Sequence, residues 1–510
     1  MKITFIYPDV LLHRPDWTGY FYVGIASLST VLTREGHETS LIHITKPIGK
    51  AEFIDRVHKE NPDLICFSST SPMFPIVKEL TGWLMEDGID VPKMCGGIHP
   101  TIAPDEAIAV DGIDIICRGE GEAAMTELCR KLDNNEDVDG IQNLWIKKNG
   151  TIQKNPLRPL MEDLDQLPFP DRSIFDYQNL YAERQGRLSF LASRGCPYNC
   201  AYCCNHLIRE IYGSEGKKIR FRSVDNIIAE IKEVVRQYPF IRTVIFDDDI
   251  LFLNRTWAGE FTERYRTEIG LPFICNARAN LMDKARVDLL KKAGCVHVKF
   301  GLESGNEKIS NGVLNRQLSN EQVKKAFALC KEAGLITESF NMVGIPFDTP
   351  SSILDTIKLN ASIAVDKMQV SIYQPYQGTK LADVCVENDF IVTKDLKSDW
   401  FSPTLKLNTI SSQHVLMFRD YFRVLVRFYQ VLMSLPGDIS RTLIASADTV
   451  LSLKITSGVL NFLYIPVNHV YRILLRMALD MQSKRLKRQS EKALLVKGRQ
   501  KATGGGMNAR

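Results

Sequence analysis

Three cysteines with short, regular spacing are the residues of this chain best suited to chemistry. Cys196, Cys200 and Cys203 lie in the stretch C-P-Y-N-C-A-Y-C. The apolar run 188–193 before them predicts a strand, and Arg194-Gly195 ends it, so the cysteines fall on the loop that follows a strand. Three thiolates bind three corners of a cubane iron–sulfur cluster and leave the fourth iron open for another ligand. The spacing therefore predicts a 4Fe–4S cluster with one free iron position.

A structural zinc site and a disulfide are the alternatives for these thiols. Zinc requires a fourth ligand to complete its tetrahedron. Cys204 adjoins Cys203, which is poor geometry for a shared tetrahedron, whereas His206 could serve. A zinc site, and with it a non-catalytic zinc-binding scaffold, therefore stays open at this point. A disulfide fits less well, because nothing in the chain suggests secretion.

The CxxxCxxC motif, with an aromatic residue before its last cysteine and a strand before the loop, resembles the radical S-adenosylmethionine (SAM) superfamily. The resemblance implies that Cys196, Cys200 and Cys203 ligate the cluster and that Tyr202 lies near SAM. It also implies that SAM chelates the open iron through its amino and carboxylate groups. Reductive cleavage of SAM, with electrons from an external donor such as a flavodoxin or ferredoxin, then gives a 5′-deoxyadenosyl radical.

The segments that must position this loop predict a partial barrel. Between 188 and 390, apolar strand-like runs alternate with amphipathic helix-like segments in six strand–helix units. After the first strand, the expected strands are 243–247, 273–276, 296–301, 338–343 and 369–373. This alternation predicts parallel strands, and the active sites of such barrels lie at the carboxyl ends of the strands. The expected fold is a partial (β/α)6 TIM-type barrel of the radical SAM kind.

Polar side chains follow several of these strands. Asp247 ends one strand, Arg278 follows the next, and Glu303 and Ser304 belong to the G-L-E-S-G run that ends a third. Carboxylates such as Asp247 and Glu303 suit the ammonium group or the ribose hydroxyls of SAM. Similar motifs in the radical SAM superfamily contact SAM or shape its pocket, so these four residues and Tyr202 are the predicted SAM contacts. A capped loop is the alternative for the acidic triplet 247–249.

Residues 1–150 also alternate strand and helix, which predicts a doubly wound parallel sheet. Such a sheet binds ligands beyond the carboxyl ends of its strands. Those ends carry small, hydroxylic or Gly-rich stretches that would let a large flat ligand approach the backbone, including Ser68, Ser69, Thr70, Gly96, Gly97 and Glu120. No G-x-G-x-x-G follows the first strand, which argues against NAD. Ordinary turn chemistry is the alternative for these loops.

The order of the two parts resembles class B cobalamin-dependent radical SAM enzymes, in which a Rossmann-like cobalamin-binding domain precedes the radical SAM domain. The resemblance implies that the Ser/Thr and Gly-Gly loops face the nucleotide tail of cobalamin. The His-ligated branch of cobalamin proteins carries D-x-H-x-x-G after the first strand, and the stretch from Asp9 to His13 departs from that spacing. Class B enzymes usually lack that ligand, so we expect cobalamin without a protein histidine on its cobalt.

The same resemblance implies methyl transfer from methylcobalamin to an unactivated carbon or a phosphinate of a small-molecule substrate. A non-methylating cyclisation or rearrangement, like that of the anaerobic magnesium-protoporphyrin cyclase, is the alternative within the family. A methylthiotransferase fits less well, because the N-terminal half lacks that family's three-cysteine set. The C-terminal sequence also does not predict that family's small β-barrel.

Two further segments complete the chain. Residues 151–187 are rich in proline and predict a semi-rigid linker. Residues 391–510 predict a helical region, in which Arg419, Arg423 and Arg427 recur every four residues and a basic tail runs from 484 to 499. The region predicts a helical cap with a solvated tail or, as the alternative, a peripheral membrane contact near a lipid-like substrate.

Composition narrows the class of protein. The net charge of +4 over 510 residues is small and does not argue for nucleic acid as a partner. Most of the 12 cysteines lie in apolar runs and predict buried thiols. The N-terminus shows no secretory signal. Free thiols and an oxygen-sensitive cluster fit the cytoplasm, or the inner face of the membrane in the lipid alternative.

Overall fold

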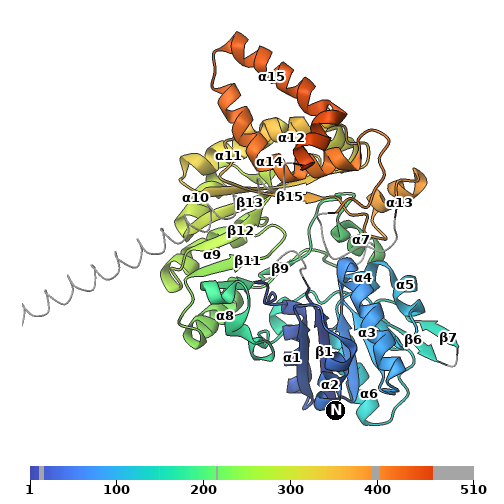
Figure 1. Cartoon of the computed structure of the whole chain (residues 1–510). Helices are drawn as coiled ribbons and strands as arrows, with labels where there is room; N and C mark the ends of the chain where they lie inside the picture. The colour runs from blue at the N-terminus through green and yellow to red at the C-terminus, as the bar shows by residue number, and fades with distance from the viewer. Residues whose placement is uncertain (11–15, 149, 214–215, 393–401, 463–510) are drawn as a thin grey trace, which may run out of the picture. The chain divides into compact units, whose positions relative to one another are not determined.

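A computed structural model describes residues 1–10, 16–148, 150–213, 216–392 and 402–462 of the chain. Residues Met1–Asp448 form one compact unit and Thr449–Arg510 a second. The Rossmann-like domain and the partial barrel expected from the sequence both belong to the first unit (Figure 1). His13 and the basic tail 484–499 lie outside the described residues.

The first sheet has seven strands in the order β2-β1-β3-β4-β5-β6-β7. The first five pair in parallel, and β6 and β7 extend the sheet as an antiparallel hairpin. The bounds are β1 Lys2–Pro8, β2 Glu38–Ile44, β3 Leu64–Ser68, β4 Lys93–Gly96, β5 Ile115–Cys117, β6 Leu144–Lys148 and β7 Thr151–Lys154. The order reverses between β1 and β3, which places the switch point of a doubly wound sheet there. The predicted fold of this part is confirmed, and the predicted boundary at 150 falls inside its last hairpin.

Helices cover this sheet because each carries one apolar face. The helices are α1 Val23–Arg34, α2 Lys50–Glu60, α3 Phe74–Glu86, α4 Ile98–Ile102, α5 Pro104–Ala109 and α6 Glu122–Asp133. In α2, for example, Phe53 and Val57 are four residues apart and both buried, so they lie on one face. They join Phe67 of β3 and Val77 of α3 in a single hydrophobic core. This packing fixes the carboxyl ends of β3, β4 and β5 at one edge of the sheet.

The second sheet is an open half-barrel of six strands, all paired in parallel, in the order β15-β14-β13-β12-β11-β8. Its strands are β8 Arg187–Phe190, β11 Thr243–Phe246, β12 Phe273–Ala277, β13 Cys295–Glu303, β14 Ile336–Val343 and β15 Lys367–Ile372. Its helices are α8 Val224–Gln237, α9 Arg255–Glu268, α10 Lys284–Ala293, α11 Asn320–Glu332 and α12 Pro350–Ser362, and they lie along one side of the sheet (Figure 1). The backbone N–H of Asn226 donates to the Ser223 hydroxyl at 3.1 Å, which caps the N-terminus of α8.

The cysteine loop leaves the half-barrel on a small ribbon. After β8 the chain forms β9 (Ser193–Arg194), which pairs antiparallel with β10 (Arg220–Phe221). Between these two strands lie the three cysteines and α7 (Cys204–Ile211), which begins directly after the last of them. The loop is therefore held at both ends by paired backbone.

The C-terminal part of the first unit is helical. It comprises α13 (Lys380–Glu387), α14 (Ser412–Met433) and most of α15 (Gly437–Ser452). Among the described residues, no single helix is long and apolar enough to cross a membrane. The helix Gly437–Ser452 and the segment Lys454–Phe462 pass that test of length and composition only together, with a bend of 78° between them.

Candidate active site

A cavity of about 540 Å³ lies between the carboxyl edge of the first sheet and the ribbon that carries the cysteine loop. The first sheet and its helices contribute much of the apolar wall, including Leu28, Phe67, Met94 and Met125. The half-barrel side contributes polar groups, including Ser193, Arg194, Cys204, Asp247 and Asp249. The cavity thus has a mostly apolar floor toward the first sheet, with polar and thiol groups on the opposite side, which is the usual lining of a small-molecule or cofactor site.

The residues predicted to contact cobalamin divide into two groups. Ser68, Gly96, Gly97 and Glu120 line the cavity, whereas Ser69 and Thr70 are not among its lining residues. The backbone of Ser69 instead ties the loops together, since its N–H donates to the Gly96 carbonyl at 2.9 Å. Its hydroxyl donates to the Thr70 carbonyl at 2.9 Å.

Gly97 is the position at which this edge of the sheet admits only glycine. Its φ is +100°, and a Cβ there would lie 2.7 Å from the carbonyl oxygen of Ser69. The Thr101 hydroxyl donates to the Gly97 carbonyl at 2.7 Å and accepts from the Gly119 N–H at 2.9 Å, which links the loops after β4 and β5. A bound ligand therefore meets backbone at this edge of the sheet.

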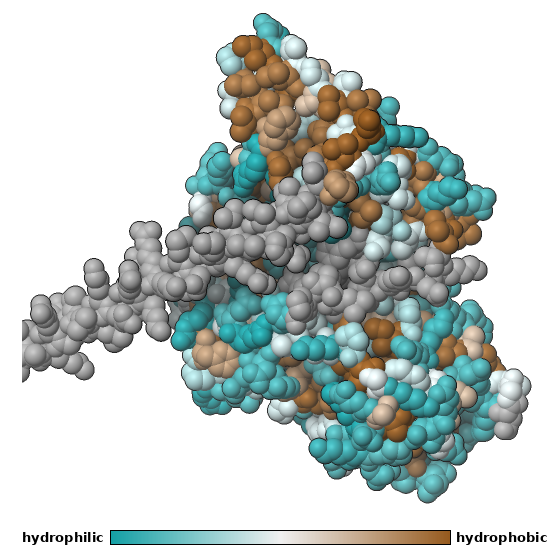
Figure 2. Space-filling view, viewed as in Figure 1, coloured by the Kyte–Doolittle hydropathy of each residue, from teal (hydrophilic) through white to brown (hydrophobic). Residues whose placement is uncertain are grey.

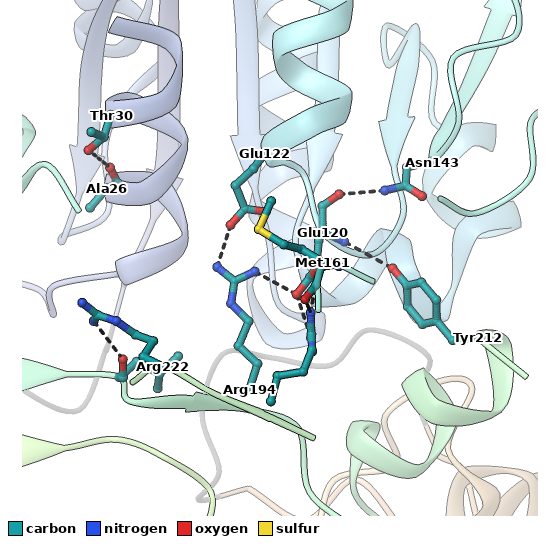
Figure 3. Close-up of polar contacts among 11 residues, drawn as sticks. Ala26, Thr30, Glu120, Glu122, Asn143, Met161, Arg194, Tyr212 and Arg222 are labelled. Carbon is teal, nitrogen blue, oxygen red and sulfur yellow. Dashed lines mark hydrogen bonds and ion pairs between the residues drawn. The ribbon is translucent and has the colours of Figure 1, made fainter. Parts of the chain in front are cut away.

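Glu120 connects the two walls of the cavity (Figure 3). Its carboxylate accepts hydrogen bonds from Arg194 of β9 at 2.8 Å and from Arg220 of β10 at 2.8 and 2.9 Å. Arg194 also donates to Glu122 at 2.6 Å. Burial alone would raise the pKa of Glu120, but the two guanidinium groups lower it below its ordinary value. Glu120 is ionised, and its hydrogen bonds hold β9 and β10 against the first sheet.

The three cysteines have different surroundings. Cys200 is buried, whereas Cys196 and Cys203 are half-buried. The Cys204 thiol hydrogen-bonds to Cys203 and is the main cause that lowers the pKa of Cys203 to about 7, whereas burial raises the pKa of Cys196 to about 11. Two guanidinium groups approach the Cys200 sulfur, that of Arg278 at 3.8 Å and that of Arg316 at 4.0 Å.

The donor set of this loop fits an iron–sulfur cluster by its chemistry. It offers three thiols on one short loop, and cysteine thiolates are the usual ligands of such clusters. Within the described residues, no group of three His, Cys, Asp or Glu side chains is arranged to hold a single metal ion. Cys204 lines the cavity, whereas the other three cysteines of the loop are not among its lining residues.

Tyr202 belongs to a buried polar cluster beyond the cysteine loop. Its hydroxyl donates to Glu303 at 3.2 Å and accepts from Arg316 at 2.6 Å. Arg316 also lies 3.6 Å from the Glu303 carboxylate and donates to the Gly301 carbonyl. Burial raises the pKa of Glu303, and the Arg316 guanidinium opposes that shift. Glu303 has φ +65°, so a strained backbone turns this carboxylate at the end of β13.

Arg316 is the member of this cluster that the sequence did not reveal. It lies 13 positions after Glu303 in the run L-N-R-Q-L, with no strand end or motif to mark it. Arg278, which was predicted, donates to the Arg316 backbone carbonyl and stacks its guanidinium 3.6 Å from the centre of the Tyr198 ring. Glu303 and Arg316 thus contact Tyr202, and Arg278 contacts Arg316 and Cys200, an arrangement suited to a ligand with both carboxylate and ammonium groups.

The acidic triplet after β11 divides by side-chain direction. Asp247 and Asp249 line the cavity. Asp248 is fully buried and accepts from the Ala192 N–H at 3.1 Å and from the Ser193 hydroxyl. The middle carboxylate therefore caps the loop, as the alternative interpretation holds, while its two neighbours are available to a ligand.

Ser304 does not reach the cavity. Its hydroxyl lies 3.5 Å from the Thr356 hydroxyl of α12 and accepts from the Asn306 N–H at 3.3 Å. These contacts belong to the packing of β13 against α12. Its assignment as a SAM contact stays a prediction.

Comparison with known proteins decides the family. Residues 20–129 match the B12 binding domain, and residues 190–359 match the radical SAM superfamily. The chain belongs to the cobalamin-dependent radical SAM enzymes. The family and the enzyme class predicted from the sequence are confirmed, and the two matched domains indicate cobalamin, a 4Fe–4S cluster and SAM as cofactors.

Relatives of this cobalamin-dependent radical SAM enzyme include methyltransferases and cyclases. An uncharacterized methyltransferase of Pyrococcus horikoshii is 26% identical over 81% of this chain and 90% of its own length. The anaerobic magnesium-protoporphyrin IX monomethyl ester cyclase of Rubrivivax gelatinosus is 24% identical over 75% of this chain and 69% of its own length.

Two solved structures share the fold. The cobalamin-dependent radical enzyme OxsB, with aqua-cobalamin and SAM bound, has a TM-score of 0.65 at 14% identity and covers 93% of this chain and 75% of its own. The methyltransferase TsrM from Kitasatospora setae, with cobalamin and a [4Fe-4S] cluster bound, has a TM-score of 0.61 at 18% identity. It covers 77% of this chain and 75% of its own.

Proposed function

We propose that this enzyme methylates an unactivated carbon or a phosphinate of a small-molecule substrate. The observation that carries the proposal is the cavity between the Gly97 edge of the first sheet and the ribbon of the cysteine loop. When bound, the cluster and SAM supply a 5′-deoxyadenosyl radical, and cobalamin supplies the methyl group. The similarity to a methyltransferase over most of both chains supports this reaction.

The chain's own residues supply binding and orientation in this proposal. Cys196, Cys200 and Cys203 hold the cluster. Tyr202, Arg278, Glu303 and Arg316 form the polar cluster beside Cys200 at which SAM binds, with Ser304 as a further SAM contact and Asp247 facing the cavity. Ser68, Gly96 and Gly97 meet cobalamin with backbone and small side chains, while Glu120 keeps the two cofactor walls together. The apolar floor excludes water from the space between them.

The environment of His99 agrees with cobalt that lacks a protein histidine. His99 follows the Gly-Gly turn, but it is not among the residues that line the cavity. Its ring stacks on Phe74 with 3.9 Å between centroids, and its Nδ1 lies 3.2 Å from the Ser71 hydroxyl. Burial lowers the pKa of His99 to about 4, so the ring is a neutral core group.

A radical cyclisation or rearrangement without methyl transfer is the second candidate, because a cyclase matches three quarters of this chain.

We assign residues 1–150 to the cobalamin-binding domain, 151–187 to the linker, 188–390 to the radical SAM domain and 391–510 to the C-terminal region. The electron comes from an external donor such as a flavodoxin or ferredoxin. The enzyme works in the cytoplasm, and a peripheral location at the inner face of the membrane is the alternative.

The cluster assignment is tested with two neighbouring cysteines. We expect Cys200→Ala, purified without oxygen, to lose iron, sulfide and all formation of deoxyadenosine from SAM. Cys204→Ala is the matched control, because Cys204 is adjacent in sequence and lies on the cavity side of the loop. It should keep the cluster. Loss of iron only in the Cys204 variant would overturn the assignment.

The reaction type is read in the same preparations. A metabolite extract incubated with SAM carrying a labelled methyl group should yield a labelled product other than SAM breakdown products. Deoxyadenosine formation with no labelled product, in protein shown to hold cobalamin, would favour cyclisation or rearrangement instead.

A further inference from the structure

The outer side of the last two helices of the first unit is apolar although it faces solvent. On α14, Val424, Phe428 and Val431 are 62%, 43% and 62% exposed and recur at helical spacing, so they lie on one face. On α15, Ile439 and Leu443 are 55% and 42% exposed and four residues apart. We call these five residues the α14–α15 apolar face. Figure 2 shows hydrophobic residues gathered over this part of the molecule.

The exposed apolar residues of α14 are not its core-facing residues, because α14 also has a buried side. The opposite side of α14 buries Phe418, Phe422 and Tyr429. The Tyr429 hydroxyl donates to Asp448 of α15 at 2.5 Å, and Lys358 of α12 donates to the same carboxylate at 2.9 Å. The inner side of α14 therefore packs in the core, and the exposed apolar side chains on its outer side are not needed for that packing.

Two of the three arginines of α14 are engaged by neighbouring groups, whereas Arg427 is exposed and donates to the Gln430 side chain at 2.8 Å. Arg419 pairs with Asp420 at 2.8 Å, and Arg423 donates to the Met368 carbonyl at 2.9 Å. Further cationic charge lies in the sequence that follows α15. Residues 463–510 contain eleven Lys and Arg against two Asp and Glu, although the whole chain carries only +4. Such a segment complements an anionic lipid surface.

We propose that the α14–α15 apolar face is a membrane-interface surface, held on anionic lipid by the basic segment 463–510. Apolar side chains enter the boundary between headgroups and acyl chains, while the basic segment is attracted to the headgroups. This docking does not depend on the proposed methyl transfer, because it uses no residue of the cavity or the cysteine loop. It would bring the enzyme to substrates that reside in the membrane.

Vesicle flotation of the full-length protein tests the proposal. The wild type should float with vesicles of phosphatidylcholine and phosphatidylglycerol at low salt, and less with phosphatidylcholine alone. Binding should weaken as salt rises, because salt screens the basic segment. The double variant Val431→Asp/Leu443→Asp should bind at least tenfold more weakly, because each substitution puts a charge in place of an apolar side chain that would enter the membrane interface. Val386→Asp on α13 is the matched control, because Val386 is also 62% exposed.

The outcomes separate the possible occupants of this face. Equal flotation of the double variant and the Val386→Asp control would overturn the proposal, as would a wild type that never floats. A wild-type dimer in solution that the double variant converts to a monomer would assign the face to a second copy of the chain instead. Circular dichroism melting checks that the variants fold, and Val431→Ser provides a milder replacement if the double variant does not. The proposed reaction is measured separately, so its failure leaves this test intact.

Discussion

Tyr202 shows how far a single side chain of this site depends on its neighbours. Its hydroxyl lies between Glu303 and Arg316, and both of these charged residues are buried. A buried carboxylate is tolerated only when it is paired and hydrogen-bonded. Here the pairing cation is Arg316, so the residue that makes Glu303 usable comes from a different loop. The charge on Glu303 is therefore stabilised by a residue that is close in the fold but 13 positions away in the sequence.

Glu183 is the buried acid that lacks such a partner. It is 1% exposed, and within the described residues its carboxylate oxygens have no side-chain hydrogen-bond partner. Burial raises its pKa to about 7, partly opposed by nearby backbone amides and by Arg172. Because the folded state favours the protonated acid, the stability from this group is present below pH 4.5 and is lost as the pH rises toward 7.

We therefore expect Glu183→Gln to remove a pH dependence. Relative to the wild type, the variant should gain up to about 3 kcal/mol of unfolding free energy between pH 5 and pH 8. Urea unfolding at the two pH values measures this difference. Glu332→Gln on the exposed side of α11 should show no such gain. The explanation fails if the Glu183 variant and the wild type change equally with pH.

At the scale of elements, the ribbon of β9 and β10 positions the cysteine loop. Gly195 turns the chain from β9 into the loop with φ +93°, and a Cβ there would lie 2.1 Å from the Lys218 carbonyl oxygen. That oxygen belongs to backbone, which cannot rotate away as a side chain can. Asp248 fixes the residues just before this turn, because it accepts hydrogen bonds from the Ala192 N–H and the Ser193 hydroxyl. The loop geometry is therefore set by backbone packing before any cofactor binds.

Gly195→Ala tests this packing against a matched glycine. Gly36 also has a positive φ, +86°, but a Cβ there meets nothing within 4 Å. Gly36→Ala should cost about 1–2 kcal/mol of unfolding free energy, the usual cost of the left-handed conformation. Gly195→Ala should cost at least about 2 kcal/mol more, because the ribbon must also shift. Chemical unfolding compares the two, and equal losses would show that the close contact at Gly195 is unimportant.

At the scale of the whole first unit, a small set of ion pairs joins the first sheet to the half-barrel. Glu120 and Glu122 follow β5, and Arg194 and Arg220 come from the ribbon next to the cysteines. Arg220 is only 4% exposed, so its charge depends on Glu120 for compensation. The same contacts that join the sheets also form part of the cavity wall, so cofactor spacing and domain association are set together.

Removing Glu120 should therefore loosen the unit as well as destabilise it. We expect Glu120→Ala to cost about 3–5 kcal/mol, because it leaves the buried guanidinium of Arg220 without its carboxylate, whereas Arg194 keeps its pair with Glu122. Glu127→Ala is the control, since the pair of Glu127 and Arg158 is 33% and 32% exposed and such pairs contribute about 1 kcal/mol or less. Urea unfolding gives the two costs. Faster proteolysis within 151–187 in the Glu120 variant alone would confirm the loosening, and equal rates would contradict it.

The sequence by itself determined the elements and the family, because both depend on local patterns. The alternation of apolar runs located the five half-barrel strands after the first to within about two residues, for example 273–276 against the observed Phe273–Ala277. The CxxxCxxC spacing after a strand is likewise local, and so is its chemistry.

Only the tertiary structure decided which polar residues meet. Glu120 turned toward two arginines of the ribbon, Asp248 toward the backbone and Ser304 toward α12. Arg316 joined Tyr202, although 114 positions separate them in the chain. The sequence shows which residues follow a strand, but a side chain at the end of a strand can point in several directions. The choice among them is made by burial and by the charges that distant segments bring alongside, and no local pattern records either.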